Sequence, residues 1–259
     1  MKLSLAYSPC PNDTFIFYKM FKKSMFNVHL HDVENLNKSL DDEKYDISKV
    51  SFYKWLTLNN KYELLKVGSA MGNGCGPILI GRGDKSLSRE SKIAIPGKNT
   101  TAHLLFQLCY GDFGNKKFMT YDKVIDSLVN YDVDFAIIIH ESRFVYQSMN
   151  LIEIKDLGQW WEKETKLPIP LGCIVAKKNL GKEVICRIEH EIKSSIDYSY
   201  ANREEVLMYV KQHAQELDLD VINNHIETYV NDFTIDLGKI GERSIAELQK
   251  RALKQGIIK

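Results

Sequence analysis

Short β-rich runs alternate with helical patterns through the first two-thirds of this chain of 259 residues. The strand-like runs are rich in apolar and β-branched residues, and turn residues separate them from segments with helical spacing. In the first part of the chain we expect strands at residues 2–7, 28–33, 45–51 and 63–70, and helices at residues 14–22, 35–43 and 52–58. Such alternation predicts βαβ units and a mainly parallel sheet.

A second set of units follows a glycine-rich break, GNGCGP, and a polar stretch, DKSLSRESK. Between the break and the polar stretch we expect a strand at residues 78–81, still in the first lobe. After the polar stretch we expect strands at residues 92–95, 117–120 and 133–140, and helices at residues 100–109 and 122–130. The run at 133–140 is almost continuously apolar, as is typical of a central parallel strand. After the segment PIPLG, the run at 173–176 predicts a strand that returns to the first lobe.

The last third of the chain has helical spacing in almost every window from residue 181 to residue 255. The sequence therefore predicts an α/β fold with two lobes and C-terminal helices that brace the first lobe. We expect residues 1–88 plus 173–259 to form a discontinuous first lobe, and residues 89–172 to form an inserted second lobe. Two lobes joined by two crossing segments can hinge and close on a ligand between them.

Composition narrows the classes of function and of partner. The chain has 35 basic and 34 acidic residues, a formal net charge of +1, so it offers no broad field for nucleic acid or for an anionic membrane surface. No apolar run approaches the about 18 residues that a membrane span needs. Five scattered cysteines without a CxxC pair favour a reducing compartment. We expect a cytoplasmic protein with a small-molecule ligand, no nucleic-acid partner and no membrane partner.

The loop SPCPNDTF lies between the first expected strand and the first expected helix. Pro9 and Pro11 fix its backbone, and Asn12 or Asp13 can cap the helix that follows. A rigid turn with a good helix cap explains these residues without any chemistry. Cys10 as a nucleophile is an alternative, but no base is identifiable beside it in the sequence.

The loop PGKNTTAHLLF follows a strand of the second lobe and opens a helix. Gly97 permits close approach of the backbone, and the amides of Thr100, Thr101 and Ala102 lie at the helix start. Such amides, together with two hydroxyls, bind a carboxylate or a phosphate without net positive charge. We favour a carboxylate, because phosphate sites more often add a positioned Lys or Arg. In the first lobe, Ser51 falls at a strand end and could donate to the same ligand.

His140 ends the apolar run in FAIIIHESRF. A histidine that leaves a buried strand is partly desolvated, which keeps the imidazole neutral near pH 7 and suits a general base. A structural histidine that caps the next helix is an equally good interpretation of this pattern. A zinc-protease motif is excluded, because Phe144 stands where HExxH needs its second histidine.

Other histidines and the tryptophan pair are weaker candidates. His29 and His31 face the same side of an expected strand, but no third metal ligand is evident. Four histidines lie on expected helices, and only the first of them is near a candidate loop: His103, His190, His213 and His225. Trp160 and Trp161 are interpreted as packing and hinge residues, with one of them a candidate for the cleft wall.

Six segments in this order resemble one known family: SPCPNDTFIFY, KVS, GNGCGP, GKNTTA, IIHESRFVY and DLGQWWEKETKLPIPLG. Together they are similar to the 1,4-dihydroxy-6-naphthoate synthases of the futalosine route to menaquinone, and the resemblance covers essentially the whole chain. It implies the two-lobed fold of type II periplasmic binding proteins. It also implies a lyase that acts on cyclic dehypoxanthine futalosine without a metal or a redox cofactor.

The resemblance also implies roles for individual residues. The family's catalytic base matches His140. Its substrate-binding residues match Lys49, Val50 and Ser51 on one side, and Thr101 and Ala102 on the other.

We add Asn37, from the segment VENLN, to the expected substrate-binding residues. One departure concerns the glycine-rich turn, where relatives often carry Arg and this chain has Asn73. The alternatives are a chorismate dehydratase of the same pathway and a solute-binding protein without catalysis. A solute-binding protein normally carries an export signal, which the N-terminal segment does not resemble, and needs no base in its cleft.

Overall fold

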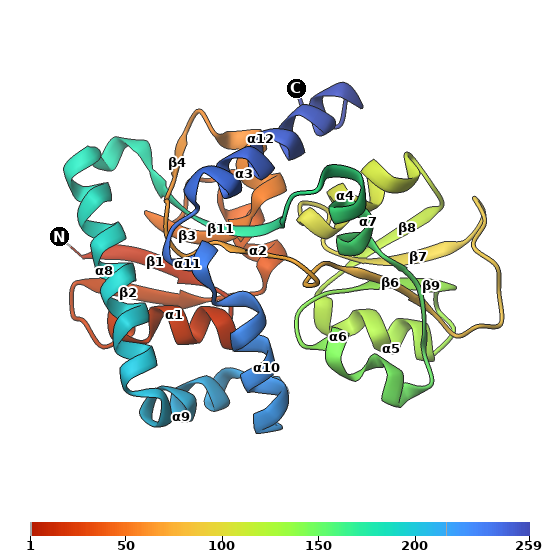
Figure 1. Ribbon diagram of the computed structural model, residues 1–259, viewed down its shortest axis with the longest axis horizontal. Coiled ribbons are helices and arrows are strands. Elements are labelled where there is room, and N and C mark those ends of the chain that lie inside the picture. The colour runs from red at the N-terminus through yellow and green to blue at the C-terminus, as the bar shows by residue number, and fades with distance from the viewer. Residues whose placement is uncertain (1, 216) are drawn as a thin grey trace.

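The computed structural model describes residues 2–215 and 217–259, which form two α/β lobes, each built around its own sheet (Figure 1). The first sheet has the order β2-β1-β3-β11-β4, and β5 pairs with β11. Its strands are β1 (Leu3–Tyr7), β2 (Phe26–Leu30), β3 (Ile47–Ser51), β4 (Tyr62–Leu64), β5 (Ala70–Gly72) and β11 (Ile169–Lys177). The helices α1 (Pro11–Phe21), α2 (Val33–Ser39) and α3 (Phe52–Leu58) follow β1, β2 and β3.

The first sheet is mixed rather than mainly parallel. β1 runs parallel to β2 and β3, as expected, but β11 is antiparallel to β3, β4 and β5. The returning strand is therefore correctly predicted, and its direction is not. Periodicity reports that a segment is a strand, whereas the direction depends on the path of the chain between the lobes.

The second sheet has the order β10-β6-β9-β7-β8. Its strands are β6 (Ile78–Gly81), β7 (Lys92–Pro96), β8 (Asn115–Met119), β9 (Phe135–Ile138) and β10 (Ile152–Asp156), with helices α4 (Thr101–Tyr110), α5 (Val124–Val129) and α6 (Ser142–Val145). β6 was expected in the first lobe, but it pairs antiparallel with β9 and β10 of the second sheet. If each strand is assigned to the lobe whose sheet it joins, the first crossing between the lobes lies at residues 73–77, before β6.

The long C-terminal segment braces the first lobe, as predicted. It contains α8 (Lys182–Ala201), α9 (Arg203–His213), α10 (Leu219–Tyr229), α11 (Asp232–Ile235) and α12 (Gly238–Lys254). On α8, the side chains of Ile188, Ile192 and Ile196 repeat at helical spacing and are buried in the core that includes α1. Among the described residues, every helix is too short or too polar to cross a bilayer.

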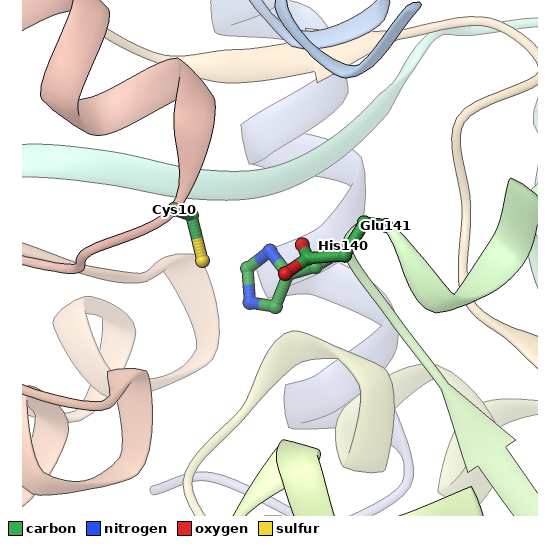
Figure 2. Close-up of side chains that lie close together, drawn as sticks. All are labelled: Cys10, His140 and Glu141. Carbon is green, nitrogen blue, oxygen red and sulfur yellow. The ribbon is translucent and has the colours of Figure 1, made fainter. Parts of the chain in front are cut away.

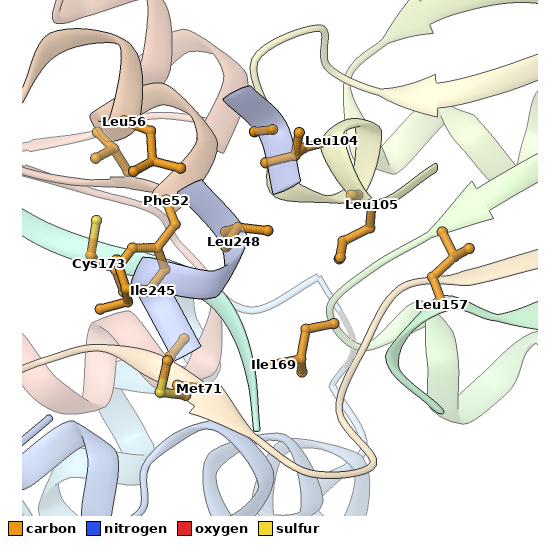
Figure 3. Close-up of a cluster of buried hydrophobic side chains, with 14 of the residues drawn as sticks. Phe52, Leu56, Met71, Leu104, Leu105, Leu157, Ile169, Cys173, Ile245 and Leu248 are labelled. Atoms are coloured by element: carbon orange, nitrogen blue, oxygen red, sulfur yellow. The ribbon is translucent and has the colours of Figure 1, made fainter. Parts of the chain in front are cut away.

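An apolar cluster joins the two lobes on one side of the molecule (Figure 3). Phe52 of α3 and Leu248 of α12 meet Leu104 and Leu105 of α4, and all four side chains are fully buried. Burial of a large apolar side chain contributes roughly 1.5–3 kcal/mol, so this cluster holds α4 against the first lobe. The start of α4 is thereby fixed relative to β3.

The two crossing segments touch where both carry glycine. The second crossing contains α7 (Leu157–Thr165), and its Gly158 packs on Gly76 of the first crossing. A Cβ added to Gly76 would lie 2.3 Å from the Cα of Gly158. The amide of Leu157 also donates to the carbonyl of Pro77, at 2.9 Å. Only glycine permits this approach of two backbones.

Candidate functional site

A cavity lies between the lobes and is lined by residues from both of them, as is common for small-molecule sites. The expected site residues Lys49, Val50, Ser51, Thr101, Ala102 and His140 all line it. Three segments far apart in the sequence therefore meet, as the positions of strand ends and helix starts predict. The wall also includes Ser8, Asn12 and Asp13 from the loop after β1 and the first turn of α1.

His140 lies just after β9, and its backbone has a φ of 55°, in the left-handed region. That conformation is uncommon for a residue with a side chain, and it turns the ring out of the sheet. The ring meets Tyr121 edge to face, with centroids 4.8 Å apart, and stacks on His225 at 6.0 Å. Its buried Nε2 has no hydrogen-bond partner among the described residues.

Burial lowers the pKa of His140 to about 4; Asp13 opposes this shift and Lys49 adds to it. The imidazole is therefore neutral at pH 7 and can accept a proton. The side chain is half-buried rather than fully buried, because it faces the cavity.

Asp13 and Lys49 form a buried ion pair in the cavity wall. The Nζ of Lys49 lies 3.2 Å from Oδ1 of Asp13 and donates to the carbonyl of Gly68 at 2.7 Å. The other carboxylate oxygen accepts from the hydroxyl of Ser8 at 2.7 Å. Asn12 or Asp13 was expected to cap α1, but that helix begins at Pro11, with Cys10 as an N-cap that makes no side-chain hydrogen bond. Asp13 instead keeps the Lys49 ammonium in place.

The start of α4 has the predicted form. Thr100 is the N-cap, and the first amides of a helix have no carbonyl partner within the helix. The hydroxyl of Thr101 donates to the carbonyl of Leu171 at 2.7 Å and accepts from the amide of Tyr53 at 3.3 Å. It therefore ties three segments together, and the backbone amides of Thr101 and Ala102 are the better donors for an anion at this helix start.

Asn37 does not line the cavity. Its side chain is fully buried, its Nδ2 donates to Oγ of Ser51 at 3.1 Å, and its Oδ1 accepts from the amide of Ser51 at 2.9 Å. Asn37 therefore lies behind Ser51 and orients it. A sequence pattern cannot separate a place in the cavity wall from a place behind it, because the packing of α2 on β3 decides between them.

The lobes also meet through polar contacts beside the cavity. Glu34 of α2 accepts from the amide of Asn99 at 3.0 Å and from its Nδ2 at 2.8 Å. Gly97 has a φ of +92°, and a Cβ there would lie 2.5 Å from Oε2 of Glu34. Gly97 thus serves the approach of the two lobes, while the helix start that follows it faces the cavity.

Cys10, His140 and Glu141 come together at the edge of the site (Figure 2). One ligand atom from each, the thiol sulfur, a ring nitrogen and a carboxylate oxygen, lies within 4.8 Å of the other two. Among the described residues this trio is the group with the geometry for a metal ion, although we expected none. Burial and the charge of Glu141 hold the pKa of the Cys10 thiol well above its usual range. The thiol is therefore protonated, which does not favour a nucleophile.

His225 is the site residue that the sequence does not reveal. It is fully buried on α10, where its Nε2 lies 2.9 Å from Oδ1 of Asn12 and its Nδ1 lies 3.5 Å from Oε2 of Glu141. We expected only His103 among the helical histidines to be near a candidate loop. His103 instead contacts the carbonyl of Lys98 at 2.8 Å and does not line the cavity.

The weaker candidates lie away from the cavity. His31 contacts the hydroxyl of Tyr45 at 2.8 Å, and His29 contacts Asn27, so neither serves a metal pair. Trp161 is fully buried and donates to the carbonyl of Pro168 at 3.1 Å, as expected of a packing residue. Asn73 lines a separate open depression near α10 and α11.

Comparison with known proteins places this chain in a family. Residues 3–254 match the family model described as menaquinone biosynthesis, and the chain belongs to this family. A protein of Thermus thermophilus named 1,4-dihydroxy-6-naphtoate synthase is 38% identical over 98% of this chain and 95% of its own length. A protein of the same name from Streptomyces coelicolor is 35% identical over 99% of this chain and 94% of its own length.

Solved structures of other proteins share this fold. The crystal structure of a protein from Archaeoglobus fulgidus is 29% identical to this chain, with a TM-score of 0.94 over 99% of this chain and 98% of that one. The alkanesulfonate-binding protein SsuA of Xanthomonas axonopodis pv. citri, bound to MOPS, is 10% identical, with a TM-score of 0.71 over 100% of this chain and 94% of that one. The predicted fold of the periplasmic binding proteins is thus confirmed.

Proposed function

We propose that this protein is the enzyme that forms 1,4-dihydroxy-6-naphthoate from cyclic dehypoxanthine futalosine, acting as a carbon–carbon lyase in the cytoplasm. The single observation that carries the proposal is a neutral, half-buried imidazole, His140, in the cavity between the lobes, opposite a helix start. Two relatives with the synthase name, each matched over more than nine-tenths of its length, support the choice of product.

The helix start holds the substrate's aromatic carboxylate. Amides at the first turn of α4 favour an anion, and the Lys49 ammonium in the opposite wall adds positive charge. Ser51, held by Asn37, donates from the first lobe. Asp13 balances most of the Lys49 charge, so the helix-start amides and the Ser51 hydroxyl carry most of the recognition of the carboxylate, and no strongly basic protein is needed.

His140 removes the proton that starts bond cleavage. A pKa of about 4 makes His140 a weak base in the empty site. A bound carboxylate favours the imidazolium, so substrate raises this pKa toward the working pH. Closure of the lobes excludes water from the step, and aromatisation of the product supplies driving force. The task of the chain's own residues is then to hold the base, His140, and the substrate's carboxylate in position.

The test is turnover by the purified protein. Incubation with cyclic dehypoxanthine futalosine should release 1,4-dihydroxy-6-naphthoate, followed by mass spectrometry, and incubation with chorismate should give no dehydration. His140→Ala should abolish turnover and change the Kd for substrate by no more than about tenfold. Binding without turnover by the wild-type protein would indicate a solute-binding protein, and dehydration of chorismate would indicate the related dehydratase. Full activity of His140→Ala would remove His140 from the mechanism.

A further inference from the structure

A chain of buried polar groups runs from the Asp13–Lys49 pair to the residue that follows His140. Asn12 donates its Nδ2 to Oδ1 of Asp13 at 2.9 Å, and its Oδ1 lies 2.9 Å from Nε2 of His225. The other ring nitrogen of His225 lies 3.5 Å from Oε2 of Glu141. This chain crosses from the first lobe to the second beside the trio of Figure 2.

The position of each proton follows from the acceptors. The Asp13 carboxylate faces the Lys49 ammonium and accepts from Ser8, so it requires a donor from Asn12 and cannot face the amide oxygen. The oxygen of Asn12 must then face His225, whose Nε2 carries a hydrogen and donates. In a neutral imidazole the other nitrogen, Nδ1, carries no hydrogen.

Nδ1 of His225 and a carboxylate oxygen of Glu141 would therefore be two acceptors facing each other. Both side chains are buried, His225 fully and Glu141 at 3% exposure. Two acceptors in such a place repel each other, and one added proton turns the repulsion into a hydrogen bond. We propose that Glu141 and His225 share one proton when the lobes are closed, and that this pair positions His140.

The second half of the inference rests on the proposed function, because it concerns the base of that reaction. Glu141 follows His140 directly, and the left-handed φ of His140 needs support from its neighbours. The contact with His225 fixes Glu141 against α10 of the first lobe, so it holds the turn from its far side. His225 touches neither the cavity nor a reacting atom, which makes it a positioning residue.

The titratable groups packed around the pair come from both lobes. On the first lobe these are Cys10, Asp13 with Lys49, and Tyr229, whose ring centroid lies 4.7 Å from that of His225. On the second lobe they are His140, Tyr121 and Arg143. Burial raises the pKa of Cys10, Tyr121 and Tyr229, so all three stay neutral near pH 7. Arg143 lies 3.7 Å from Asp156, which balances its charge.

Substitutions at Glu141 distinguish two roles of its side chain: sharing a proton with His225, or carrying a negative charge. Glu141→Gln offers an amide hydrogen to Nδ1 of His225, so kcat should stay within about threefold of wild type. Glu141→Ala removes the contact, and because a 1 Å displacement of a catalytic group can cost about 100-fold, kcat should fall between roughly 10- and 100-fold with a smaller change in KM. Equal loss of kcat in both variants would overturn the proposal.

Substitutions at His225 test the same pair from the other side. An Asn side chain places its amide near Nδ1, and a Gln side chain places its amide near Nε2. His225→Asn can therefore still donate to Glu141, whereas His225→Gln keeps only the contact with Asn12. We expect kcat of His225→Asn to exceed that of His225→Gln by about tenfold, with both variants folded by circular dichroism. The reverse order would contradict a role through Glu141.

A measurement without substrate keeps this inference separate from the proposed function. In long-range ¹H–¹⁵N spectra of the wild-type protein, the His225 signals are those absent in His225→Gln. They should show a protonated Nε2 and an Nδ1 that is hydrogen-bonded. An imidazole protonated at Nδ1, with a bare Nε2, would overturn the shared proton. If the wild-type protein instead shows this pattern but does not turn over the futalosine substrate, the proposed function fails and the proton pair remains.

Discussion

Removal of the Glu34 carboxylate should weaken substrate binding without touching the cavity wall. In Glu34→Ala the closed form loses both hydrogen bonds to Asn99, at 3.0 and 2.8 Å. Hydrogen bonds to charged groups contribute about 1.5–3 kcal/mol each, and in the open form water replaces them. The lower value for both bonds gives about 3 kcal/mol against closure, which is roughly 100-fold in the equilibrium between the closed and open forms.

The expected result is a KM raised between roughly 10- and 100-fold, with kcat at saturation almost unchanged. Steady-state kinetics measure both constants, and small-angle scattering measures the shift toward the open form. Glu242→Ala removes an exposed carboxylate of α12 and serves as the control. A KM within twofold of wild type for Glu34→Ala would refute the reasoning.

Gly97→Ala should reproduce the Glu34 effect from the other lobe. Its Cβ would lie 2.5 Å from Oε2 of Glu34, and the φ of +92° adds backbone strain. Gly111→Ala is the matched control, because Gly111 has a φ of +72° and open space around it. If both glycine variants raise KM equally, strain alone explains the effect and the contact between Glu34 and Asn99 does not.

Two further predictions concern the site itself. Burial lowers the pKa of His140 to about 4, below the unfolded value, so its contribution to stability is complete above about pH 6.5 and is lost as pH falls toward 4; burial lowers the pKa of His225 in the same direction. Urea unfolding of wild type and His140→Gln at pH 7.5 and 5 should show a smaller acid loss in the variant, and an equal loss would contradict the assignment. Thr101→Val should raise KM at least tenfold, since it leaves the amide of Tyr53 and the carbonyl of Leu171 without their partner, and an unchanged KM would argue against that role.

Local patterns were enough to predict most elements and the loops that form the site. The helix at residues 52–58 is found as predicted, and the loops that carry Ser51, Thr101 and His140 do meet in one cavity. These predictions succeed because periodicity, capping residues and strand ends are properties of short segments. The same patterns do not determine which strands pair with one another, which is why β6 was expected in the wrong sheet.

Through-space contacts were beyond the reach of the sequence. Asn12 and His225 lie 213 positions apart, and no spacing rule connects a residue of α1 to one of α10. The pairing of Asp13 with Lys49 was missed for a related reason, since Asp13 also fits the pattern of a helix cap. When a residue fits a local role equally well, the sequence does not reveal its contact with a distant part of the chain.

The glycine contact between the crossing segments limits how the lobes can move. Gly76 and Gly158 meet backbone to backbone, and Leu157 is bonded to Pro77 beside them. The two crossings therefore behave as a single pivot rather than as two independent tethers. We therefore expect any opening of the cavity to be a rotation about this contact, in which Glu34 and Asn99 separate while Gly76 and Gly158 stay in contact. A side chain at Gly76 or Gly158 would push the two crossing segments apart. We expect this to misalign the lobes, although no residue of the cavity wall is changed.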